Sequence, residues 1–134
     1  MLPALPVESP APVDDCLTLA PPTRWGRKAV LKMRNASDSY AVRSPAGELL
    51  AVVYLWRFED GSREFALTLG PQARRFMRAL VRTAQLTLRG LAQDGVVVTA
   101  CVAPGHLPGE RMAWLTGFEP HPYKSGTWVY VWRL

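Results

Sequence analysis

Two side chains in this sequence could carry protons during a reaction, Glu64 and His106. Glu64 lies in an alternating apolar segment, residues 63–69, where a carboxylate could act as a general base. His106 lies in a loop, residues 104–109, and an imidazole titrates near neutral pH, as acid–base catalysis requires. The alternative interpretation is that both are surface residues, since Glu64 follows a hairpin turn and His106 stands close to glycine and proline. For each residue taken alone, the surface position is the favoured interpretation.

Four arginines recur along one face of the longest predicted helix, residues 71–94: Arg74, Arg78, Arg82 and Arg89. They belong to a basic chain, with 16 Lys and Arg against 11 Asp and Glu and a net charge of +5. Such a row could contact the phosphates of a nucleic acid or an acidic protein surface. The alternative is an ordinary solvated helix face. The row is therefore a candidate partner or nucleic-acid surface.

Other familiar catalytic and binding patterns do not occur in the sequence. Serine, histidine and acidic residues are present without a nucleophile elbow. Two cysteines and two histidines are too scattered for a zinc site, so no metal is expected. There is neither a Walker loop nor a dinucleotide fingerprint. No apolar run reaches the ~18–20 residues that a membrane span needs.

Hydrophobic periodicity predicts the elements that would position these residues. Residues 24–34 could form a short amphipathic helix, and alternation predicts strands at 40–43 and 63–69. A high content of aliphatic and aromatic residues predicts a further strand at 48–57. Asp60-Gly61 predicts a hairpin turn between the last two of these strands. A long helix over 71–94 precedes a buried strand over 96–102, a short helix that ends at Gly117, and a strand over 127–134. This order predicts an α/β fold with one mixed sheet flanked by helices.

The N-terminal segment differs in composition from the rest. Residues 1–22 contain six prolines, a density that argues against a helix and against a central strand. We expect an extended Pro-rich arm, and a disordered leader is the alternative. The expected division is an arm over residues 1–22 and one domain over residues 23–134.

The layout of the second half resembles that of GNAT-type acyl-CoA N-acyltransferases. The resemblance is carried by Arg78-Ala79-Leu80-Val81 early in the long helix, and by the run from Arg111 to Phe118 after the buried strand. It implies a GNAT-like mixed sheet and a binding site for acetyl-CoA, which is the candidate cofactor. In these enzymes a glycine-rich loop before the long helix binds the coenzyme A pyrophosphate through backbone N–H groups.

In this sequence that loop keeps Gln72 at its polar first position, whereas Arg75 and Met77 occupy the glycine positions. The resemblance implies a weakened pyrophosphate site, in which arginine side chains could still meet phosphate. Its candidate residues are Leu69, Gly70, Gln72, Arg74 and Arg75. The alternative is that the arginines here are solvated surface residues.

The second GNAT signature is also altered. Many of these enzymes use a tyrosine of the short helix to reprotonate the leaving thiolate, and that position holds Ala113. Alanine cannot transfer a proton, so this route is closed unless another residue replaces it. His106 stands where the family carries an asparagine. The resemblance thus leaves it open whether the protein is an enzyme.

A narrower resemblance is to the internal virion protein A family of short-tailed phages, which are GNAT-like and also lack the glycine-rich loop. It rests on Phe65, Leu67 and Thr68, on the run from Ala73 to Arg78, and on Arg111, Leu115 and Gly117. It implies a catalytically degenerate, virion-associated or assembly protein, located in the phage virion or the bacterial host cytoplasm. The Pro-rich arm would then dock on other phage proteins.

Three functions therefore stand as expectations. The first is the degenerate phage-type protein, which the replacements at Arg75, Met77 and Ala113 favour. The second is an active acetyl-CoA-dependent N-acetyltransferase with substitutes for the lost groups. The third and weakest is a nucleic-acid-binding accessory protein that uses the arginine face.

Overall fold

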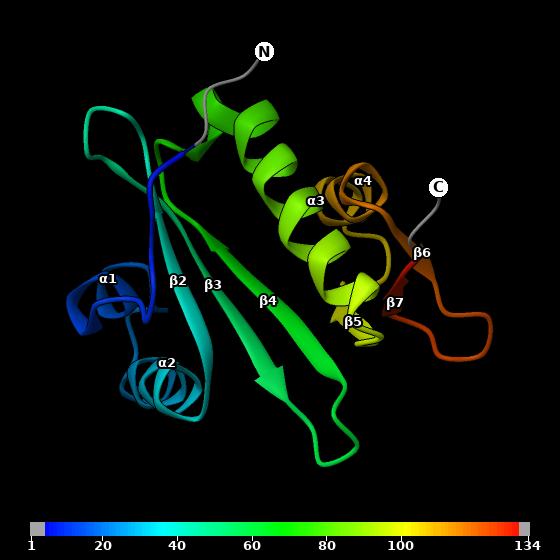
Figure 1. Cartoon of the computed structure of the whole chain (residues 1–134). Helices are drawn as coiled ribbons and strands as arrows, with labels where there is room; N and C mark the ends of the chain where they lie inside the picture. The colour runs from blue at the N-terminus through cyan, green and yellow to red at the C-terminus, as the bar shows by residue number, and fades with distance from the viewer. Residues whose placement is uncertain (1–4, 132–134) are drawn as a thin grey trace.

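A computed structural model describes residues 5–131, and its centre is one mixed sheet of seven strands (Figure 1). The strands lie in the order β1-β2-β3-β4-β5-β7-β6; β4 and β5 are parallel, and the other neighbouring pairs are antiparallel. Their bounds are β1 Val7–Glu8, β2 Ser37–Arg43, β3 Leu49–Arg57, β4 Arg63–Leu69, β5 Val98–Cys101, β6 Phe118–Pro120 and β7 Thr127–Tyr130. The α/β class and the single mixed sheet are confirmed.

Helices cover both faces of this sheet. In Figure 1, α1 (Val13–Thr18) and α2 (Arg24–Ala36) lie on one side, while α3 (Met77–Gln93) and α4 (Leu107–Thr116) lie on the other. A short 3-10 helix, η1 (Ala73–Phe76), leads into α3, so the single helix predicted over residues 71–94 has an irregular first turn. Among residues 5–131, no helix is long and apolar enough to cross a membrane.

Strand alternation decides which side chains face which helices. Ala41, Val52 and Tyr54 are buried with α1 and α2, whereas Leu55, Val98 and Ala100 are buried with Leu88 of α3 and with α4. Successive residues of a strand point to opposite faces, so the central strands β2, β3 and β4 contribute side chains to both cores. The predicted Asp60-Gly61 turn forms, with Gly61 in the left-handed region at φ +88°.

The C-terminal strands differ from the prediction. The strand expected over residues 96–102 is shorter, because Gly95 turns the chain at φ +78° and regular pairing with β4 begins only at Val98. Residues 118–120 form the edge strand β6, which the sequence did not predict; three residues are too few to show alternation. The final strand β7 ends at Tyr130, and residues 132–134 of the predicted strand lie outside the described residues.

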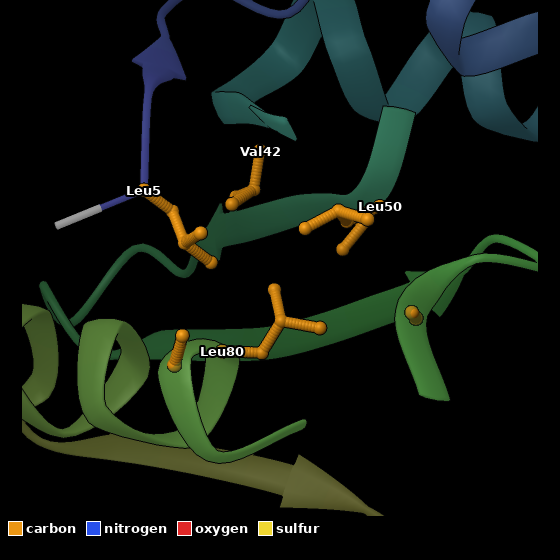
Figure 2. Close-up of a cluster of buried hydrophobic side chains, with 7 residues drawn as sticks. Leu5, Val42, Leu50 and Leu80 are labelled. Atoms are coloured by element: carbon orange, nitrogen blue, oxygen red, sulfur yellow. The ribbon is translucent and has the colours of Figure 1, made fainter. Parts of the chain in front are cut away.

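The N-terminal segment is not an extended arm where the structure describes it. The expectation that its prolines exclude a helix was wrong: α1 fits between Pro12 and Pro21, with Pro12 at the N-cap, where no helical N–H is needed. Residues 7–8 form the edge strand β1 against β2. Figure 2 shows Leu5 together with Val42, Leu50 and Leu80, so this segment completes the core between the sheet and α3.

The parallel strands β4 and β5 separate partway along β4. Their register pairs Arg63 with Val98, Glu64 with Thr99 and Phe65 with Ala100, and then ends. Strand β4 continues to Leu69, where it is paired with β3 alone. The sheet is therefore open between the second half of β4 and the end of β5.

Candidate functional site

The opening between β4 and β5 forms a cleft of about 720 Å³. Its walls come from β4, from β5 and the loop after it, and from α4, with Met77 of α3 at one end. The lining is mainly apolar, and Glu64, Cys101 and His106 are the side chains in it that bear acid–base groups. The cleft thus brings together both proton carriers predicted from the sequence and adds a third.

The added residue is Cys101, which donates its S–H to Oε1 of Glu64 at 3.1 Å. The register explains this contact: Glu64 pairs with Thr99, and Cys101 lies two residues further along β5 on the same face. That face is opposite α3, because Phe65 and Ala100 point towards α3. Cys101 is exposed and Glu64 half-buried, so solvent reaches the pair.

The hydrogen bond has an electrostatic consequence for the thiol. The hydrogen bond to Glu64 is the largest cause that raises the pKa of Cys101, followed by partial burial and by the negative charge of Glu64. Cys101 therefore holds its proton at pH values at which an ordinary cysteine begins to ionise. At neutral pH it is therefore protonated, and it is a poor thiolate nucleophile.

This pKa shift predicts how fast Cys101 reacts with iodoacetamide, which attacks thiolates. We expect Glu64→Gln to speed alkylation severalfold at pH 8, because the substitution replaces the carboxylate that accepts the hydrogen bond of the thiol and removes the charge that disfavours the thiolate. The gain should vanish at a pH well above both pKa values, where the thiol is ionised in either protein. Mass spectrometry of the intact protein measures the rate, and Cys101→Ala shows that the buried Cys16 contributes nothing. Equal rates at pH 8 would contradict the coupling.

The side chain of His106 caps the N-terminus of α4. Its Nδ1 accepts the backbone N–H of Gly109 at 3.1 Å, as an N-cap side chain does. A side chain at position 109 would collide with this ring, since an added Cβ would lie 2.6 Å from Nδ1. With Nδ1 accepting, the neutral imidazole carries its proton on Nε2. His106 thus lines the cleft as a possible hydrogen-bond donor.

The predicted pyrophosphate loop is compact. The N–H of Ala73 is bonded to the carbonyl of Gly70, and the N–H of Arg75 to that of Gln72. These two amides are therefore directed into the loop itself. Gly70 is closely packed, because a Cβ there would lie 3.0 Å from the carbonyl oxygen of Leu49, a tight contact with backbone. Of the five predicted residues, Leu69 lines the cleft, whereas Arg74 and Arg75 lie beside a hollow next to Leu5.

Three of the four predicted arginines line one groove between α3 and α4. Arg74, Arg78 and Arg82 face it from η1 and α3, and Arg111 joins them from α4. The groove has a volume of about 1030 Å³ and shares Met77, Pro108 and Met112 with the cleft, so the two are continuous.

The fourth arginine of the row, Arg89, lies further along α3 and lines a separate hollow with Trp114. Among residues 5–131, no group of three His, Cys, Asp or Glu side chains is placed to hold a metal ion.

Comparison with known proteins identifies the fold. No family model and no curated protein sequence matches this chain. Several solved structures match it. A Bacillus subtilis acetyltransferase in complex with CoA aligns with a TM-score of 0.68 and 13% identity, over 93% of this chain and 95% of that one. A Staphylococcus aureus N-acetyltransferase aligns with a TM-score of 0.69 and 8% identity, over 96% of this chain and 97% of that one. A third match is an IAA acetyltransferase from Bacillus cereus, with a TM-score of 0.63 and 16% identity over 91% of this chain and 84% of that one. The chain therefore has the GNAT-like acyl-CoA N-acyltransferase fold, while nothing here supports the narrower resemblance to phage internal virion proteins.

Proposed function

We propose that this protein is an acyl-CoA-dependent N-acyltransferase, which moves an acyl group from a coenzyme A thioester to an amine. The observation that carries the proposal is the open β4–β5 cleft, which places a hydrogen-bonded carboxylate and thiol beside a groove with four arginines. Fold likeness alone would not be enough, because one fold supports many functions.

The arginine groove fits the phosphates of coenzyme A. Arg75 and Met77 stand where related enzymes carry glycines, so the backbone cannot approach a pyrophosphate as closely. Arg78, Arg82 and Arg111 can contact phosphate through guanidinium groups instead, which bind such oxygens in a bidentate manner. The continuity of groove and cleft lets one elongated molecule keep its phosphates on the arginines and its thioester near Glu64.

The Glu64–Cys101 pair supplies a closed route for one proton. The bound thioester supplies an activated acyl group. The carboxylate of Glu64 takes the proton that the amine loses as the new C–N bond forms. The thiol of Cys101 gives its proton to the sulfur that leaves when the C–S bond breaks, and Glu64 returns its proton to Cys101. Both residues end as they began, so the route balances without an additional reactant.

Cys101 in this scheme does what a tyrosine does in many enzymes of this fold. The tyrosine position is Ala113, which is 7% exposed and packed in the core under the cleft. Both the donor and the acceptor of this proton are sulfur atoms, whose ordinary acidities are similar. Glu64 raises the pKa of Cys101, and protonation of Glu64 by the amine removes that effect.

With the narrower resemblance unsupported, the non-catalytic alternative rests on the missing glycines and tyrosine. The Glu64–Cys101 pair and the arginine groove offer replacements for both. Neither the fold nor the comparisons support a virion location, phage partners or nucleic-acid binding, so we do not adopt these parts of the expectation.

Calorimetric titration of acetyl-CoA tests the proposal directly. We expect Arg78→Ala/Arg82→Ala to weaken binding by about tenfold or more, since hydrogen bonds to charged groups contribute about 1.5–3 kcal/mol when well formed and less at exposed sites. Arg89→Ala is the matched control, because Arg89 lies outside the groove. No heat of binding at millimolar acetyl-CoA with the unmodified protein would overturn the proposed function.

A further inference from the structure

A small apolar cavity lies behind the cleft, between α3 and strands β2, β3 and β4. It has a volume of about 60 Å³. Val53 and Leu55 of β3 line it from the sheet, and Leu80 and Ala84 line it from α3. Neither the proton route nor the arginine groove uses this space.

The polar groups on the α3 side of the cavity are already satisfied. The hydroxyl of Thr83 donates to the carbonyl of Ala79 at 2.9 Å, and that of Thr87 donates to the carbonyl of Thr83 at 3.1 Å. Across the cavity the phenol of Tyr40 has a raised pKa, caused first by burial. A water molecule needs at least two polar partners to be held in such a space, so the cavity favours an apolar occupant.

The cavity and the cleft share one wall. Phe65 and Leu67 of β4 and Met112 of α4 line both spaces. Phe65 and Leu67 point to the α3 side of the sheet, away from the Glu64–Cys101 pair on the other face. Methionine is unbranched and adopts many shapes, so a small rotation of Met112 would join the two spaces.

We infer that the acyl donor carries a chain longer than acetyl, whose end enters this cavity past Phe65, Leu67 and Met112. The inference rests on the proposed function and deepens it by naming the donor. A cavity of about 150 Å³ holds benzene, or about 25 Å³ for each carbon. The present volume therefore takes about two carbons beyond acetyl, which makes butanoyl-CoA the best-fitting donor.

The test is a chain-length series of calorimetric titrations on the full chain with CoA, acetyl-CoA, butanoyl-CoA and octanoyl-CoA. We expect butanoyl-CoA to bind about tenfold more tightly than acetyl-CoA, because two methylene groups leave water. Octanoyl-CoA should bind no more tightly than butanoyl-CoA, since the cavity is full at four carbons.

Ala84→Leu places extra side-chain volume in the cavity and should abolish the preference for butanoyl-CoA while acetyl-CoA binding stays within about twofold. Ala92→Leu makes the same change on α3 outside the cavity and should keep the preference. A thermal melt establishes that each variant is folded. The series on the unmodified protein stands independently of either variant.

The outcomes separate this inference from the proposed function. Binding of CoA and acetyl-CoA with no gain for butanoyl-CoA overturns the inference and leaves the N-acyltransferase proposal standing. A steady gain through octanoyl-CoA that survives in Ala84→Leu also overturns it, because the chain would then lie in the cleft alone. No binding of any of the four ligands overturns both.

Discussion

Glu64→Gln is expected to lower kcat by about 10²- to 10⁴-fold, the range that general acid–base catalysis contributes. The substitution keeps the shape of the side chain but removes the group that takes a proton from the amine. It also breaks the return path to Cys101, whose thiol donates to Glu64 at 3.1 Å. KM for the thioester should stay within about twofold, because loss of an interaction specific to the transition state lowers kcat without weakening ground-state binding.

Release of free CoA thiol, with butanoyl-CoA as donor and a panel of dipeptide and polyamine amines as acceptors, measures this effect. Glu59→Gln is the matched control, because it makes the same chemical change at an exposed residue of the β3–β4 turn. Its kcat should equal that of the unmodified protein. Unchanged turnover in Glu64→Gln would show that Glu64 carries no proton in the reaction and would remove the relay through Cys101.

Deletion of residues 1–11 is expected to destabilise the protein by about 3–5 kcal/mol, mainly because burial of Leu5 is lost. Leu5 is 6% exposed in the core between the sheet and α3 (Figure 2). The deletion also removes β1 and leaves the buried hydroxyl of Ser39 without its bond from the N–H of Ala11. Since a domain is stable by only about 5–15 kcal/mol, the truncated chain should be close to unfolding.

Thermal unfolding followed by circular dichroism gives the magnitude, and Tm should fall by about 10–25 °C for a chain of this size. Val7→Ala is the control within the same segment, because Val7 is 47% exposed and its truncation should cost less than about 1 kcal/mol. A truncated protein with unchanged Tm would mean that the segment docks without contributing to stability, as an independent arm would.

The N-terminal segment also shows where sequence reasoning failed. The number of prolines in residues 1–22 shows how often a helix would be interrupted, but it does not show how long the proline-free stretches are. The gap between Pro12 and Pro21 is long enough for the six residues of α1. A helix of six residues is too short to show a recognisable periodicity, and its stability comes from burial of Cys16 against the sheet and from the ion pair of Asp15 with Arg43 at 2.5 Å.

The middle of the chain was predictable because its signals are local. The apolar run of β3, the alternation in β4, the Asp60-Gly61 turn and Gly95 after α3 each act within a few residues, and each element forms where it was predicted. Several candidate residues of the site could also be named from the sequence. The arginine row was identified by residue type and spacing, and Glu64 and His106 were named as candidates together with the resemblance to GNAT enzymes. The roles of all these residues in function remain predictions.

From residue 24 to residue 116 the sequence by itself determined the order of strands and helices, and it supplied candidate side chains for acid–base and phosphate chemistry, because periodicity and residue type are properties of short segments. Only the tertiary structure decided which of them meet. Cys101 is 37 residues from Glu64 along the chain, and Arg111 is 29 residues from Arg82. The parallel register of β4 and β5 brings Glu64 and Cys101 into contact, and the packing of α4 beside α3 places Arg82 and Arg111 on one groove. Such contacts depend on how separate strands and helices assemble, which no short segment encodes.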